Sequence, residues 1–141
     1  MAIRIKIFIF LLGLKKSSSI PISQPEGKVV VDSEYYTMMP GDYQWKEDNI
    51  EIKTISSLDI NKLADDFETL AVEKRKTLKF EIEKNPLSLT LTKLNEDGTS
   101  DNVEIKDNKI IMPSEEGYYI YELKATWAEG KETFVFDVYV E

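Results

Sequence analysis

The sequence predicts an all-β protein, an antiparallel β-sandwich with one short helix. Near the end of the chain, residues 115–127 and 134–140 alternate strictly between apolar and polar side chains, as strands with one buried face do. Upstream, short alternating segments recur with turn signals between them, which is typical of two packed sheets. The chain of 141 residues, with six Phe, seven Tyr and two Trp, is long enough to fill the core of one domain.

The first 19 residues resemble an export signal. Two basic residues precede an apolar stretch from Ile7 to Leu14, and three serines follow soon after. That stretch is shorter than the roughly 20 residues that span a bilayer. An amphipathic strand is the alternative, because Ile3, Ile5, Ile7 and Ile9 occupy every second position. We expect residues 1–19 to be removed or to serve as an anchor, and the protein to be secreted or attached to the cell envelope.

A linker and a series of short strands follow this segment. Residues 20–27 contain two prolines and are expected to be extended, ahead of a single domain at 28–141. Pro40-Gly41-Asp42 predicts a turn. The strands expected before the terminal pair are 28–32, 50–54, 77–83, 87–94, 103–105 and 109–112.

One helix is predicted between the second and third of these strands. Apolar side chains at 60, 63, 64, 67, 70 and 71 follow the spacing of one helix face. Ser56 is expected to cap this helix, with Asp59 as the residue that reaches back. Such a helix would lie over one edge or end of the sandwich.

The terminal pair of strands is expected to form a hairpin. A two-residue loop at Glu129-Gly130, or a four-residue loop at 128–131, would pair Tyr121 with Val138 and would place Ile120 opposite Tyr139. Ile120 and Tyr139 would then form a partly apolar outer stripe, covered by the N-terminal segment or free as a docking surface. The residues predicted to be buried are Phe80, Leu89, Tyr119, Tyr121, Leu123, Phe134, Phe136 and Val138.

The start of this hairpin resembles the tyrosine corner of immunoglobulin-like domains. Residues 115–119 have the acidic-x-Gly-x-Tyr spacing that begins strand F of that fold. The resemblance implies that strands B, C and E are 77–83, 87–94 and 109–112, and that the Tyr119 hydroxyl bonds to backbone just upstream. Tyr121 and Phe80 would replace the disulfide cysteines, and Leu89 is nearest the place of the strand C tryptophan.

Two aromatic motifs carry a second resemblance. Gly41-Asp42-Tyr43-Gln44-Trp45 lies near the start of the domain, and the sequence from Gly117 to Trp127 lies near its end. Over residues 28–141 the chain is similar to small exported or envelope-attached proteins of Gram-positive bacteria whose function is unknown. Those proteins often carry a cysteine for lipid attachment, whereas this chain has none.

Composition excludes several kinds of active site. The chain has no His and no Cys, so a Ser-His-Asp triad, a thiolate zinc site and a disulfide are all excluded. It also lacks Ser-x-x-Lys, Gly-x-Gly and Gly-Lys-Ser/Thr motifs. We therefore expect no enzyme, no catalytic residues and no cofactor.

Charge argues against a nucleic-acid partner. The formal net charge is −8. All 26 acidic residues but only 14 of the 18 basic ones lie from Glu26 onward, so that part of the chain carries a net charge of −12. A surface of this sign repels phosphate backbones.

One acidic loop invites comparison with a calcium site. Asn95, Asp97, Gly98 and Glu104 fall at four positions of the EF-hand loop, but Lys93 occupies the first position, where a carboxylate is needed. An acidic hairpin loop is the favoured interpretation, and no metal site is expected.

The favoured function is a non-catalytic, extracellular or envelope-associated binding module. Its partner would be a protein or a cell-surface glycan, and its membrane contact would be limited to the N-terminal segment. Aromatic side chains often form such contact surfaces. The candidate binding residues are Tyr36, Trp45, Tyr118 and Tyr139. The alternative is a small-ligand or calcium-binding sensor domain that uses the loop at 95–102.

Overall fold

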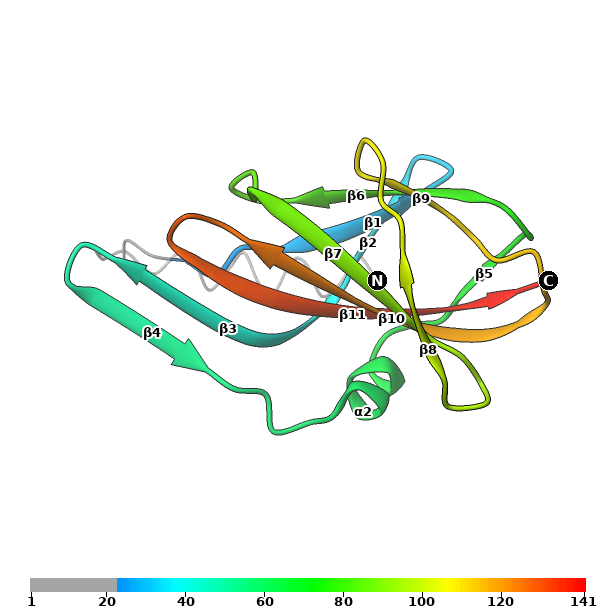
Figure 1. The fold of residues 1–141 in the computed structure, drawn as a ribbon, viewed down its shortest axis with the longest axis horizontal. Helices are drawn as coiled ribbons and strands as arrows, with labels where there is room; N and C mark the ends of the chain where they lie inside the picture. The colour runs from blue at the N-terminus through cyan, green and yellow to red at the C-terminus, as the bar shows by residue number, and fades with distance from the viewer. Residues whose placement is uncertain (1–22) are drawn as a thin grey trace, which may run out of the picture.

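The computed structural model describes residues 23–141, so the predictions for the export segment and the start of the linker lie outside the described residues. The domain is an all-β sandwich of two packed sheets with one short helix, as predicted (Figure 1). The smaller sheet contains, in spatial order, β2 (Glu34–Thr37), β1 (Gly27–Val31), β6 (Thr77–Ile82) and β9 (Lys109–Ile111). No helix among residues 23–141 is long and apolar enough to cross a membrane.

The larger sheet holds the remaining strands. Its spatial order is β4 (Ile50–Thr54), β3 (Met39–Glu47), β11 (Gly130–Val140), β10 (Gly117–Thr126), β7 (Ser88–Leu94) and β8 (Ser100–Val103). A short strand, β5 (Leu70–Val72), pairs in parallel with the last residues of β11, and the other pairs are antiparallel. The orders β6-β9 and β8-β7-β10-β11 match B-E and C′-C-F-G of an immunoglobulin-like sandwich.

The core centres on the ring of Phe136. Tyr121 stacks on this ring at 4.9 Å between centroids, and Phe80 meets it edge-on at 5.9 Å. Three packed rings therefore occupy the place where antibody domains carry a disulfide. All the residues predicted to be buried are buried except Leu89, which is only half-buried because it lies near the start of β7, while Leu91 takes the deep position.

The predicted tyrosine corner is present. The Tyr119 hydroxyl donates a hydrogen bond of 2.8 Å to the carbonyl oxygen of Glu115. This bond ties the start of β10 to the loop before it, which fixes where the strand enters the sheet.

The predicted helix is shorter than expected. It is α2, Ile60–Asp65, and Asp59 rather than Ser56 is its N-cap, because the Asp59 carboxylate accepts a bond from the Lys62 amide. Leu70 belongs to β5 instead, since the buried residues at 70 and 72 also fit the period of a strand. The apolar pattern at 60–71, read as one helix, therefore covers two consecutive elements, the helix α2 and the strand β5.

Helix α2 covers the outer face of the β10–β11 hairpin. Leu63 and Ala64 pack against Ile120 and Val135, on the side of the large sheet opposite the small sheet (Figure 1). Ile120 is buried and lies opposite Asp137, not Tyr139. Helix α2 therefore covers Ile120, which was expected to meet the N-terminal segment or a docking partner, whereas Tyr139 stays exposed.

The hairpin register differs from the prediction by two residues. Tyr121 pairs with Phe136, and Trp127 and Gly130 close the loop Ala128-Glu129. A shift of two leaves every side chain on its predicted face, so alternation could not detect it. Gly130 is needed for close approach and not for the turn, because a Cβ there would lie 2.0 Å from the carbonyl oxygen of Gln44 on β3.

The predicted turn at Pro40-Gly41-Asp42 is a β-bulge within β3. The register with β11 shifts between Glu132 and Phe134, and the Asp42 amide donates a 2.8 Å bond to the Thr133 hydroxyl. Turn-forming residues inside a strand commonly mark such bulges. The β3–β4 hairpin reaches one end of the molecule (Figure 1).

Candidate binding groove

The four aromatic residues predicted to bind a partner do not form one surface. Tyr36 lies on the edge strand β2 of the small sheet, and its hydroxyl donates a 2.8 Å bond to Glu34. Trp45 lies on β3 in the large sheet, whereas Tyr118 and Tyr139 face each other across β10 and β11. The fold therefore brings together two of the four.

Trp45 is part of the core and not of the surface. It is 2% exposed, lies edge-on to Trp127 at 5.3 Å, and donates from Nε1 to the Glu47 carboxylate at 2.9 Å. Tyr43 stacks beside it at 6.1 Å and is also buried. A surface platform built on Trp45 is excluded because β3 turns this side chain inward.

The Tyr118–Tyr139 pair is engaged with acidic neighbours. The Tyr118 hydroxyl donates to the buried carboxylate of Asp137, and the Tyr139 hydroxyl donates to Glu116 at 3.2 Å. Burial, followed by the bond to Asp137, raises the pKa of Tyr118 well above its ordinary value. Only Tyr139 of the pair is exposed, so this pair offers little aromatic area.

The large sheet has a groove of about 520 Å³ next to the β3–β4 hairpin, lined by both polar and apolar atoms, which we call the β3–β4 groove. Its floor comes from paired strands. Lys53, Gln44, Lys131 and Thr126 are consecutive cross-strand neighbours on β4, β3, β11 and β10. A second row places Thr133, Lys124 and Thr90 side by side. Direct cross-strand neighbours share one face of a sheet, so these side chains converge on the groove.

One wall of the groove is fixed by a long-range hydrogen bond. The Asp42 carboxylate at the bulge accepts a 2.8 Å bond from the Ser56 amide, 14 residues further along the chain. This bond holds the segment after β4, which includes Ile55, beside the groove. The bulge in β3 therefore helps to shape the wall.

The lysines of the groove lack ion-pair partners. Within residues 23–141, no carboxylate lies within 4.0 Å of Lys53, Lys124 or Lys131. The acidic groups that line the groove are Asp42, Glu122 and Glu132. Asp42 is bonded to Ser56, and Glu132 is almost fully buried. The groove thus holds three lysines without an ion-pair partner among residues 23–141, together with the Asp42 and Glu122 carboxylates.

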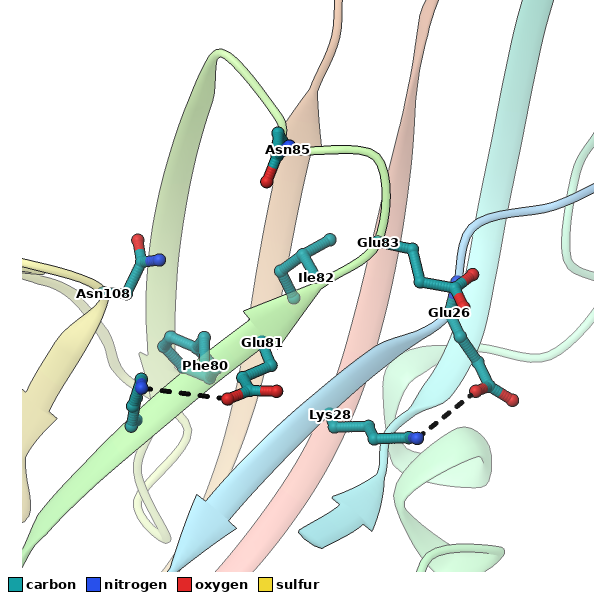
Figure 2. Close-up of a pocket in the computed structure, with 9 residues that line it drawn as sticks. Glu26, Lys28, Phe80, Glu81, Ile82, Glu83, Asn85 and Asn108 are labelled. Atoms are coloured by element: carbon teal, nitrogen blue, oxygen red, sulfur yellow. Dashed lines mark hydrogen bonds and ion pairs between the residues drawn. The ribbon is translucent and has the colours of Figure 1, made fainter.

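A hollow on the small sheet provides a contrast (Figure 2). It measures about 370 Å³ and is also lined by lysines, but these are paired. Lys28 reaches Glu26 at 3.8 Å, and Lys79 reaches Glu81 at 3.7 Å. Its positive charges are therefore compensated within the protein.

The acidic loop at 95–102 is held by its own side chains. Asp97 accepts bonds from the Thr99 amide at 2.9 Å and the Thr99 hydroxyl at 2.6 Å, and Asn95 donates to Asp101 at 3.0 Å. The Thr99 bonds lower the pKa of Asp97. Among residues 23–141, no group of three or more acidic side chains is placed to hold a metal ion. The calcium-sensor alternative stays a prediction.

The groove residues were missed at the level of sequence. In the sequence they are the outward-facing polar positions of alternating strands. These are Thr90 on β7, Lys124 and Thr126 on β10, and Lys131 and Thr133 on β11. Such residues are usual on any solvated sheet face. Only the position of the β3–β4 hairpin makes them parts of one groove.

Comparison with known proteins adds no relative. No protein-family model matches the chain, and neither the curated proteins nor the solved structures contain a significant match.

Proposed function

We propose that this protein is a non-catalytic binding module of the bacterial cell envelope and that it holds its partner in the β3–β4 groove. The support is the convergence of hydrogen-bonding and charged side chains from five strands on one concave surface. Concave surfaces with a few convergent polar groups are the usual places where ligands bind.

The location in this proposal rests on the N-terminal sequence. Residues 1–19 combine basic residues with a short apolar stretch, as export signals do. Export would place the groove outside the membrane, where it meets envelope polymers and proteins. Cell fractionation tests this directly, and full-length protein found in the cytosol would contradict it.

Site-specific photo-crosslinking tests the role of the groove. A photoreactive residue at Thr126 lies on the groove floor, whereas one at Glu81 lies on the outer face of the small sheet as a matched exposed control. We expect intact cells to give a crosslinked species from position 126 and not from position 81. Equal crosslinking at both positions, or none at position 126, would contradict a binding role for the groove.

A further inference from the structure

Resting on the proposed function, we propose that the β3–β4 groove binds an anionic polysaccharide, a sugar chain that carries carboxylate or phosphate groups. Lys53, Lys124 and Lys131 would contact the anionic groups, and the hydroxyl and amide side chains of the floor would contact the sugar hydroxyls.

The spacing of the lysines favours a ligand with repeated negative charges. Lys53 and Lys131 occupy the same cross-strand row with one strand between them, so their Cα atoms lie about 10 Å apart, twice the distance between neighbouring strands. Lys124 lies on the next strand of the sheet. Three lysines at this spacing can each meet a separate anionic group of a ligand that carries several negative charges.

The rest of the floor suits a sugar. Gln44, Thr90 and Thr126 carry amide and hydroxyl groups that can both donate and accept hydrogen bonds. The Glu122 carboxylate can accept bonds from sugar hydroxyls, whereas it would repel a ligand made only of acidic groups. A chain that alternates anionic groups with free hydroxyls matches both kinds of side chain.

An acidic peptide fits the groove less well. The floor strands β3, β11, β10 and β7 are paired on both sides, so the free strand edge that borders the groove is the outer edge of β4. Peptides and proteins otherwise bind through apolar and aromatic anchors that fill pockets. Of the two large apolar or aromatic side chains that line the groove, Tyr43 is buried and Ile55 is exposed. The groove therefore offers a peptide only Ile55 as an exposed apolar contact.

Calorimetric titration of the folded protein tests the ligand class. The probes are oligogalacturonate, which carries carboxylates, and phosphomannan fragments, which carry phosphates. Methyl-esterified oligogalacturonate serves as the neutral sugar, and poly-glutamate serves as the acidic peptide. We expect binding of one or both anionic glycans that weakens as salt rises, with weaker binding of the ester and of poly-glutamate.

Two triple variants with the same change of charge locate the site. K53Q/K124Q/K131Q should lower the affinity by about tenfold or more, the equivalent of at least one charge-assisted hydrogen bond. K28Q/K79Q/K109Q changes three lysines of the small sheet and should leave the affinity within about twofold, because long-range charge effects are screened by salt. Thermal melts of both variants establish that they fold.

Three results would overturn the proposal. The first is that neither anionic glycan binds more tightly than the methyl ester. The second is that poly-glutamate binds as tightly as the glycans. The third is that the two triple variants lose affinity equally. If position 126 still crosslinks in cells while no anionic glycan binds, the polysaccharide is wrong as the ligand and the binding module stands. If position 126 does not crosslink and no anionic glycan binds, both the binding module and its polysaccharide ligand are refuted.

Discussion

Tyr43 on β3 and Glu132 on β11 lie directly opposite each other on the inner face of the large sheet. Within the described part of the chain, the Tyr43 hydroxyl and the Glu132 Oε1 are buried without a hydrogen-bond partner. The other carboxylate oxygen, Oε2, accepts a 2.7 Å bond from Gln24. Burial raises the pKa of Glu132 to about 7, although the bond from Gln24 opposes this shift.

This buried carboxyl should make stability depend on pH. Its ordinary pKa is 4.5, so between pH 4.5 and about 7 the folded state holds the proton more tightly than the unfolded state does. The stabilising effect is complete below pH 4.5 and is lost as pH rises to about 7. Glu132→Gln removes the charge, and at pH 8 we expect this variant to be more stable than the parent by up to about 3 kcal/mol.

Urea unfolding at pH 5 and pH 8 measures this difference. The gain from Glu132→Gln should be larger at pH 8, whereas Glu81→Gln, at an exposed position on β6, should change stability little at either pH. If the effect of Glu132→Gln is the same at both pH values, the carboxyl does not titrate as its burial requires.

The tyrosine corner should contribute a measurable part of the stability. Tyr119→Phe removes the hydroxyl that bonds to the Glu115 carbonyl and leaves the packed ring in place. We expect a loss of about 1 kcal/mol, the net value of one such bond. Tyr139→Phe removes an exposed hydroxyl from the paired strand and should cost less than about 0.5 kcal/mol. Equal losses in chemical denaturation would show that the corner bond has no special role.

Two glycines should respond to alanine in different ways. At Gly130 the new Cβ would lie 2.0 Å from the Gln44 carbonyl oxygen, so β3 and β11 would have to separate. We expect Gly130→Ala to cost roughly 3 kcal/mol or more, as strong overpacking does. Gly98 has open space around it but a φ of +91°, so Gly98→Ala should cost about 1 kcal/mol through backbone strain alone. Thermal melting compares the two, and an equal or larger loss at Gly98 would contradict this order.

Local patterns were sufficient to predict the architecture, and non-local contacts were needed for the groove. Alternation and turn residues located the strands and the corner at Tyr119, because these features depend on neighbours in sequence. The bond between Asp42 and Ser56, which shapes the groove wall, leaves no periodic trace. The pattern at 60–71 was ambiguous because helix and strand spacings overlap at Leu70.

Strand alternation also predicts the buried position of Glu132. It places Glu132 on the same face as Phe134 and Phe136, which predicts a carboxyl turned toward the core. The two-residue error in register placed Phe134 opposite Ala125 in the position that Glu132 occupies. A shift of two keeps every side chain on its face, so Glu132 points inward in either register.

The acidic loop at 95–102 should not respond to calcium. Its Asp97 already accepts two bonds from Thr99, and Asp101 accepts a bond from Asn95 and lies 3.8 Å from the Lys93 ammonium. A calcium ion would have to displace these partners and approach a lysine, which opposes the charge it needs. We therefore expect the same melting temperature with calcium as with a chelator.

A sensor domain would behave differently in this measurement. Calcium at about 100 times its Kd would stabilise the folded state by roughly 2.7 kcal/mol, because it would bind that state alone. Magnesium at the same concentration controls for the general effect of a divalent cation on an acidic protein. The calcium sensor would be favoured over the binding module by a rise in melting temperature that calcium produces and magnesium does not. Asp97→Asn should then abolish this rise, because the loop would bind calcium despite its own hydrogen bonds.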